Sequence, residues 1–291
     1  MDEIKELPSK EMISSAYINF LLGSGVNGKA LGQFNSFTNT IELLKVKLGR
    51  DVTDLEKAID ELNQQEDIDE VRKLFDKEFE EKLAVVDYNN ESIKNIGDLF
   101  IEIYKIVSKT ENRVDFLNQV NIYTLNYDDI VENSLKNNGL LVNTVAPSNI
   151  DTNKKYYNML GYDMLYKKFI PSFLVSKIHG DKNQKVLPGY NKFKDVLGSK
   201  VFEIMFRMKE NLFKMNSLLI VIGYKGNDQD VNDIIYDSIK AGLTVYWYCY
   251  SNDDVKAVPD KLKNLISIVN VNGVMDSTKK CMEDLKKIWE E

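Results

Sequence analysis

The sequence has few of the residues that build metal sites and disulfide frameworks. Its 291 residues include only two cysteines, Cys249 and Cys281, which lie far apart and form no C-x-x-C pair. This spacing excludes a disulfide scaffold and a zinc ribbon, so we expect two free thiols and no metal cofactor. Histidine is scarcer still, because His179 is the only one in the chain.

The chain also lacks the features of nucleic-acid-binding and membrane proteins. Its 38 Lys and Arg residues are outnumbered by 45 Asp and Glu residues, and the net charge is −7. Binding to a phosphate backbone therefore has little electrostatic support, and we expect no direct nucleic-acid partner. No apolar run approaches the roughly 18 residues of a membrane span, and the first ten residues are charged where a secretory signal is apolar. We expect a cytoplasmic protein without membrane contact.

Apolar residues make up 43% of the chain, which is enough for the core of one large domain. Short apolar runs bounded by glycine or polar turns alternate with longer stretches of helical period, as in a parallel sheet covered by helices. The predicted strands are residues 17–22, 121–125, 173–178, 218–222, 244–250 and 266–271. We therefore predict an α/β fold, a Rossmann-like doubly wound parallel sheet, in a single domain that spans residues 1–291.

A charged segment at residues 51–118 separates the first two predicted strands. Its apolar positions, such as Leu55, Ile59 and Leu62, recur with helical period. The segment is too long for a simple crossover between strands. We predict an inserted helical lobe that closes over the ligand cleft as a lid.

Closely spaced glycines follow the first predicted strand, at Gly23, Gly25 and Gly28. Gly23 and Gly25 allow a tight turn and a close approach of the backbone to a pyrophosphate, whose charge suits a helix N-terminus. The third glycine of a dinucleotide fingerprint is displaced, and no acidic residue follows a second strand at the usual distance. A phosphate-binding loop and a plain strand-to-helix turn both remain open.

Polar residues also follow three later strands of the predicted sheet. Asn126, Asp128 and Asp129 follow residues 121–125, and a helix cap explains one aspartate but not Asn126. A lone histidine is more often structural than catalytic, yet His179 follows residues 173–178 and can exchange protons near neutral pH.

Gly223 ends residues 218–222, where an ordinary turn with an Asp or Asn cap is the alternative to a binding loop. All these groups are expected at one edge, because ligands bind at the carboxyl ends of parallel strands.

In chain order, these segments resemble the signature of the sirtuin superfamily over about residues 18–272. The matching segments are Gly23-Ser24-Gly25, Thr124-Leu125-Asn126-Tyr127-Asp128, His179-Gly180 and Gly223-Tyr224.

The resemblance implies a site that binds NAD. Its phosphates would lie on the loop formed by Gly23, Ser24, Gly25 and Asn27. Asn126 would orient the nicotinamide ribose and an attacking water, and Asp128 would contact the nicotinamide side. His179 would act as the base on a ribose hydroxyl or on water. The adenosine half would face Gly223, Tyr224 and Asn270.

The chain departs from protein-deacylating sirtuins in three ways. It has no four-cysteine zinc ribbon, it carries Leu125 in place of the family's Gln, and it lacks the Pro-Asp-Phe-Arg segment after the glycine loop. It therefore looks more like the zinc-free sirtuin-like hydrolases of bacterial anti-phage systems.

That resemblance implies an NAD glycohydrolase that releases nicotinamide and ADP-ribose and depletes NAD during infection. It also implies a homo-oligomer and an activator, either a HerA-type ATPase or a phage component. Alternatives are a non-catalytic sensor of NAD or ADP-ribose, an NAD-dependent protein deacylase and an ADP-ribosyltransferase.

Overall fold

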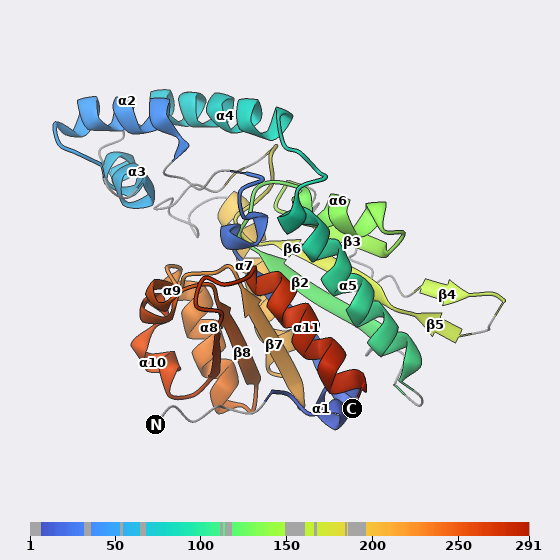
Figure 1. Ribbon diagram of the computed structural model, residues 1–291. Helices are drawn as coiled ribbons and strands as arrows, with labels where there is room; N and C mark the ends of the chain where they lie inside the picture. Colours follow the sequence, from blue (N-terminus) through green and yellow to red (C-terminus); the bar gives the residue numbers. More distant parts are fainter. Residues whose placement is uncertain are drawn as a thin grey trace.

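The computed structural model describes residues 7–31, 36–52, 55–64, 68–110, 113, 118–148, 161–165, 168–183, 185 and 196–290. A parallel sheet of seven strands runs through this part of the chain, in the order β3-β6-β2-β1-β7-β8-β9 (Figure 1). The strands are β1 Tyr17–Leu22, β2 Gln119–Thr124, β3 Leu141–Val145, β6 Ser172–Lys177, β7 Ser217–Ile222, β8 Thr244–Cys249 and β9 Ser267–Asn270. The predicted α/β fold with a Rossmann-like parallel sheet is confirmed.

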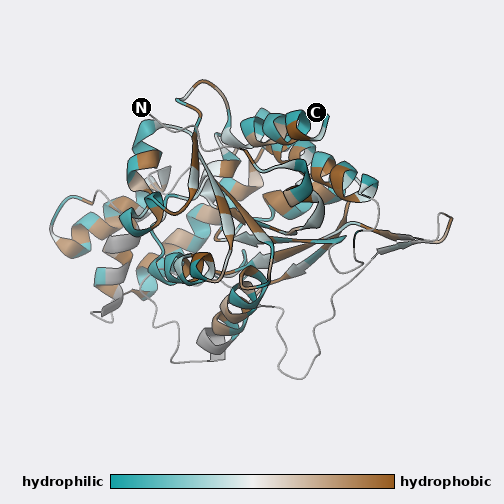
Figure 2. Ribbon diagram, turned by 90° about the horizontal axis from the view of Figure 1, so that it is seen from below, coloured by the Kyte–Doolittle hydropathy of each residue, from teal (hydrophilic) through white to brown (hydrophobic). Residues whose placement is uncertain are grey.

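Helices cover both faces of the sheet. One face packs against α5 Glu91–Lys109, α6 Ile130–Asn137 and α11 Ser277–Glu290, and the other against α7 Val196–Leu212 and α8 Gln229–Lys240. In Figure 2, hydrophilic and hydrophobic residues occur together within individual helices, as expected for helices with one side on the sheet and the other in solvent. No helix in the described residues is long and apolar enough to cross a membrane.

Strand β7 shows why the central strands are uniformly apolar. All six of its residues are buried. Leu218, Ile220 and Ile222 point to the core beneath α5 and α11, while Leu219 and Val221 point to the core beneath α7 and α8. A strand covered on both faces has no solvated side, so it carries an apolar run rather than an alternating pattern.

Strand β3 was not predicted from the sequence. It lies at the edge of the sheet, and four of its five residues are only half-buried. Its run of Leu141, Val142 and Val145 is a weak strand signal because polar residues interrupt it. The short hairpin formed by β4 Gly161–Asp163 and β5 Lys168–Ile170 was also not predicted and extends away from the sheet in Figure 1.

The predicted lobe at residues 51–118 contains α3 Leu55–Gln64, α4 Asp69–Ala84 and α5. Helix α5 packs against α11 and α6, so it belongs to the helical layer on the sheet. Helices α2 (Thr38–Leu48), α3 and α4 instead lie beyond one end of the sheet in Figure 1. The segment that stands apart therefore runs from α2 to α4, and its action as a lid stays a prediction.

Glu78 is one reason why α2 stays on α4. Its buried carboxylate accepts hydrogen bonds from the backbone N–H of Thr40 at 3.0 Å and from the Thr40 hydroxyl at 2.9 Å. These bonds satisfy donors of the first turn of α2, which would otherwise need a capping side chain. Phe37 stacks on Phe75 of α4 with ring centroids 5.0 Å apart.

The remaining short elements complete the layers. They are α1 Lys10–Ser15, the 3-10 helix η1 Ser24–Asn27, α9 Asn252–Ala257 and α10 Asp260–Lys263. Both cysteines are buried free thiols, as the sequence predicted.

Candidate functional site

The order of the strands places the glycine loop at the topological switch point of the sheet. From β1 the chain continues to β2 on one side, and after β6 it crosses to β7 on the other side. In open parallel sheets a ligand crevice forms outside the carboxyl ends of the two strands where the order reverses. Four consecutive strands of the sheet, β6, β2, β1 and β7, run parallel to one another. The segments that follow them therefore lie at the same edge of the sheet.

The glycines after β1 and β7 pack directly against each other. The Gly25 N–H donates to the Gly223 carbonyl oxygen at 3.0 Å. A Cβ atom at Gly23 would lie 2.4 Å from that oxygen, and one at Gly223, whose φ is +67°, would lie 2.5 Å from the Val26 nitrogen. These glycines therefore permit the contact between the two loops.

This contact also limits how the glycine loop can bind a phosphate. The N–H groups of Gly23 and Gly25 both donate to backbone carbonyls, those of Ile222 at the end of β7 and of Gly223 in the loop that follows. Ser24 and Gly25 nevertheless remain exposed at the surface of η1. Phosphate binding by Gly23, Ser24, Gly25 and Asn27 stays a prediction.

Asn126 reaches from the loop after β2 to the glycine loop. Its backbone N–H donates to the Thr124 hydroxyl at 3.1 Å, and its side-chain Nδ2 donates to the Gly23 carbonyl oxygen at 3.4 Å. The side chain is buried, with the residue only 6% exposed. The structure thus brings together two segments that the sequence placed at the same edge.

Asp128 combines a capping role with a second link to the glycine loop. Its Oδ1 accepts from the Ile130 N–H at 3.0 Å, at the start of α6, and its Oδ2 accepts from Nδ2 of Asn27 at 2.9 Å. Burial raises the pKa of the Asp128 carboxyl, against the opposing effect of the nearby Lys177 ammonium. The N-cap residue of α6 is Asp129, whose side chain makes no capping bond, so Asp128 meets the first N–H of the helix from one residue before the cap. A capping role does not account for the bond to Asn27.

His179 forms a charge-capable pair with a residue that the sequence analysis did not connect to it. The His179 Nε2 lies 2.7 Å from Oδ2 of Asp228, and both side chains are mostly buried. Asp228 caps α8, because its Oδ1 accepts from the Val231 N–H at 3.0 Å. The cap signal was visible in the sequence, whereas the contact across 49 residues of chain was not.

Tyr224 holds the loop that carries Asp228. Its hydroxyl accepts from the Asp228 N–H at 3.0 Å and donates to Asn232 Oδ1 at 2.9 Å. Its ring stacks on Trp247 with centroids 5.4 Å apart. Tyr224 is therefore a bracing residue for this loop, and a contact with adenosine stays a prediction.

Asn270 lies apart from the other predicted site residues. It ends the edge strand β9, where its Nδ2 donates to Asn252 Oδ1 at 2.6 Å and its Oδ1 accepts from the Asn272 N–H at 2.9 Å. Both partners, Asn252 and Asn272, lie near the end of β9 and are not among the predicted site residues. Its predicted role at the adenosine half stays untested.

Helix α4 contacts the segments that follow β2 and β6. The ring of Tyr127, between Asn126 and Asp128, meets Phe79 edge-to-face with centroids 6.1 Å apart. Lys185, which follows His179, forms an ion pair with Asp76 of α4 at 2.9 Å. The helices beyond the sheet are thus coupled to the loops that carry the candidate residues.

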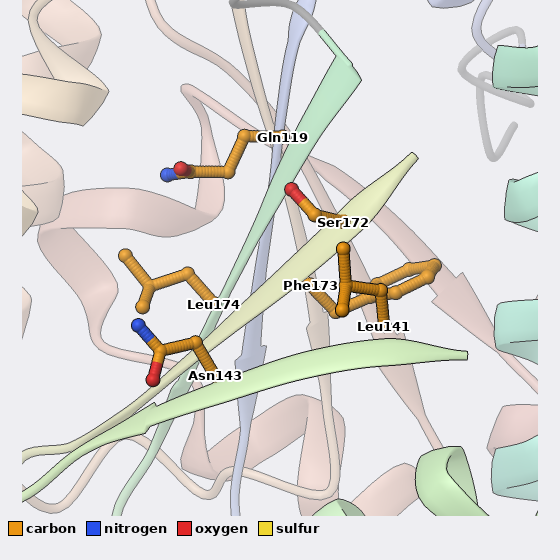
Figure 3. Close-up of a pocket in the computed structure, with 6 residues that line it drawn as sticks. All are labelled: Gln119, Leu141, Asn143, Ser172, Phe173 and Leu174. Carbon is orange, nitrogen blue, oxygen red and sulfur yellow. The ribbon is translucent and has the colours of Figure 1, made fainter. Parts of the chain in front are cut away.

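Two hollows in the described part of the chain lie away from this cluster. Figure 3 shows one at the amino ends of β2, β6 and β3, with Gln119 and Ser172 on its rim, and it is too small to hold a water molecule. A larger cavity of about 540 Å³ lies beside α7, where Tyr123 and Arg207 contribute to the lining. Neither hollow includes His179, Asn126 or the glycine loop.

A family model for the SIR2-like domain matches residues 120–268, just over half of the chain. This chain therefore belongs to the family of proteins with a SIR2-like domain. Such a domain indicates an NAD-related function, typically that of an NAD-dependent enzyme. The matched region contains Asn126, Asp128, His179, Gly223 and Tyr224, whereas the glycine loop and Asn270 lie outside it. No curated protein matches the chain.

Among the described residues, no group of three or more His, Cys, Asp or Glu side chains is arranged to hold a metal ion.

Proposed function

We propose that this protein is an NAD glycohydrolase that uses water to cleave NAD to nicotinamide and ADP-ribose. The observation that carries this proposal is the His179–Asp228 pair at 2.7 Å, at the sheet edge shared with Asn126 and the glycine loop. The SIR2-like domain supports NAD as the substrate, and the switch-point position supports a nucleotide site.

The pair gives His179 a defined protonation role. Asp228 is fixed by the α8 cap and by the Tyr224 hydroxyl, and we expect its second carboxylate oxygen, Oδ2, to hold the Nε2–H tautomer of the ring. The other ring nitrogen, Nδ1, is then the proton acceptor. It takes the proton that water loses as the new C–O bond forms, a contribution that is typically about 10²–10⁴-fold in rate.

Asn126 supplies orientation rather than proton transfer. Nicotinamide leaves a cationic precursor as a neutral base, so the protein mainly has to hold the ribose and water in place around an oxocarbenium-like transition state. The buried Asn126 amide is fixed against the Gly23 carbonyl, and its side chain suits that task. We expect Asp128, two residues along the chain, to contact the nicotinamide side.

We also propose, on the sirtuin-like resemblance, that NAD depletion serves anti-phage defence and that the activity is controlled by assembly. An unregulated NAD hydrolase would be toxic to its own cell. Candidate controls are a homo-oligomer, a HerA-type ATPase and a phage component. The packing of α4 on Tyr127 supplies a route by which an assembly partner could act on the loop of Asn126. Size-exclusion chromatography with and without the ATPase tests this, and an inert monomer in both samples would contradict it.

The hydrolase proposal is tested by incubating the purified protein with NAD and quantifying nicotinamide and ADP-ribose by chromatography. Wild type is expected to release both in equal amounts, while His179→Ala and Asn126→Ala release nearly none and keep the wild-type circular dichroism spectrum. Full activity in both variants would refute the assignment. Tight NAD binding without release would favour the sensor alternative, and turnover that requires an acyl-peptide would favour a deacylase.

A further inference from the structure

Lys177 is a buried charged residue that the proposed reaction leaves unexplained. It ends β6, two residues before His179, and is only 2% exposed. Lysine is almost never fully buried unless it is paired, because removing an ammonium group from water is costly. The position of its hydrogen-bond partners therefore indicates what the residue does.

The two partners of Lys177 lie on the polypeptide that follows β2. Its Nζ donates to the backbone carbonyl oxygen of Asp128, and it lies 3.0 Å from Oε1 of Glu132 on α6. Glu132 is itself 3% exposed, and its second oxygen has no hydrogen-bond partner among the described residues. The ammonium group is thus neutralised by the Glu132 carboxylate, and it also donates a hydrogen bond to a backbone carbonyl of the candidate site.

The bond from Lys177 completes a three-way attachment of Asp128. The side chain of Asp128 is bound to Asn27 of η1 and to the N–H of Ile130 in α6, while its carbonyl is bound to β6 through Lys177. Two segments distant in sequence, η1 and β6, and the adjacent start of α6 therefore fix one residue. Because Asn126 is two residues upstream, the same attachment limits the position of its side chain.

We propose that Lys177 is a positioning residue of the NAD site: it holds the Asn126–Asp128 loop against the strand that carries His179, and Glu132 acts as its counter-charge. This inference rests on the proposed hydrolase function and adds to it a residue that touches neither substrate nor water. Misplacing a catalytic group by about 1 Å can cost about 100-fold in rate, so such a brace has a measurable effect.

Lys177 also sets the electrostatic state of the loop. Two buried carboxyl groups, Asp128 and Glu132, share this one ammonium, and its charge lowers the pKa of each against the effect of burial. Asp129 also faces Asp128 and raises its pKa. Removing the ammonium is therefore expected to move protonation of Asp128 to higher pH.

The test compares Lys177→Met with the double variant Lys177→Met/Glu132→Leu in the NAD cleavage assay. The single variant leaves Glu132 buried without its counter-charge and is expected to lose both thermal stability and turnover. The double variant replaces the ion pair by apolar side chains, which is often neutral or stabilising. It is expected to regain the wild-type melting temperature while its kcat stays about 10- to 100-fold low, since the charge-assisted bond to Asp128 is still missing.

Two further readouts separate positioning from a purely structural role. The acid limb of the kcat/KM–pH profile is expected to shift to higher pH in the double variant. Glu132→Gln keeps Lys177 and its bond to Asp128, so its kcat is expected to stay within about threefold of wild type even if stability falls. If the double variant does not fold, a kcat loss of 10-fold or more in Glu132→Gln would overturn the proposal, because the bond from Lys177 to Asp128 would then be present without maintaining turnover.

Wild-type turnover and an unshifted pH profile in the folded double variant would overturn the positioning role and leave the proposed hydrolase intact. No NAD cleavage by the wild-type chain, either alone or with an extract of phage-infected cells as the source of the activator, would instead overturn the hydrolase, and this inference with it.

Discussion

The two halves of the sheet differ in what they bury. On the β2–β6 side of β1, the loop after β2, helix α6 and the end of β6 bury Asp128, Glu132 and Lys177 beside Asn126. On the β7–β9 side, β7 is apolar at five of its six buried positions, from Leu218 to Ile222, and Asp228 caps a helix. Buried ionic groups add little stability compared with well-packed apolar residues. The comparison teaches that the first half, here called the reactive half, buries the charged groups beside the proposed site, while the second, the platform half, is apolar along its central strand.

The His179–Asp228 pair is where the halves meet. His179 follows β6 and Asp228 follows β7, with β2 and β1 between these strands in the sheet. The glycine contact between Gly25 and Gly223 is a second junction, between the adjacent strands β1 and β7. Substitutions at either junction test how the two halves are linked. Substitutions within each half test whether the halves differ in their effect on catalysis and stability.

The largest effect is expected in the reactive half, from Asn126→Ala. The loss of its amide frees the water and ribose, so kcat is expected to fall by about 10² or more. Tyr224→Phe, in the platform half, removes a hydroxyl that braces a loop and is expected to change stability by about 1 kcal/mol, with a much smaller change in kcat. Steady-state kinetics and denaturant unfolding of both variants test the contrast, and equal kcat losses would contradict it.

Breaking the glycine junction is expected to destabilise the fold. Gly223→Ala combines a φ of +67° with a Cβ only 2.5 Å from the Val26 nitrogen. Gly139→Ala is the matched control, because its φ is +72° and nothing lies within 4 Å of the added Cβ. The control is expected to lose about 1 kcal/mol of unfolding free energy, and Gly223→Ala about 2 kcal/mol more. Equal losses in urea unfolding would show that the two loops can separate at no cost.

Breaking the other junction with Asp228→Asn is expected to affect catalysis more than stability. Asparagine caps a helix about as well as aspartate, but it removes the charge that holds the His179 tautomer. We expect kcat to fall by roughly 10-fold, as for the loss of one charge-assisted hydrogen bond, with a change in unfolding free energy below about 0.5 kcal/mol. Asp228→Ala should lose stability as well. A kcat of Asp228→Asn equal to wild type would remove Asp228 from the mechanism.

The buried carboxyls should make the stability of the reactive half depend on pH. Burial raises the pKa of Glu132 above its ordinary value of 4.5, so the folded chain holds this proton more tightly than the unfolded chain. Its contribution is fully present below that value and is lost as pH rises through the folded-state pKa. We therefore expect Glu132→Gln to gain stability relative to wild type as pH rises from about 4 to 7. The opposite trend in urea unfolding would contradict the direction of the shift.

The smallest effect is expected at the thiols, which lie outside both junctions. Burial raises the pKa of Cys249 to about 12 and also raises that of Cys281. Since the thiolate is the nucleophile, native protein at pH 8 is expected to react with iodoacetamide far more slowly than denatured protein. Mass spectrometry measures the labelling. Rapid labelling of Cys249 in the native state would show that the end of β8 opens readily.

The sequence predicted the platform half better than the reactive half. The apolar run of β7 and the cap at Asp228 are local patterns, and they identify a strand and the start of a helix without tertiary information. Asn126 and His179 were singled out because strand ends carry functional groups in this fold, and their catalytic roles stay predictions. Lys177 was missed because a lysine in a strand suggests an exposed residue, and its burial depends on Glu132 in another segment. The Asp228 partner of His179 was missed for the same reason.

The most direct test of the central claim is nicotinamide release from NAD by wild type and His179→Ala, with NAD binding of both proteins measured by calorimetry. The account predicts that both bind NAD with similar affinity and that only the wild type releases nicotinamide at an appreciable rate. Equal release by the two proteins would show that the His179–Asp228 pair is not the centre of the reaction.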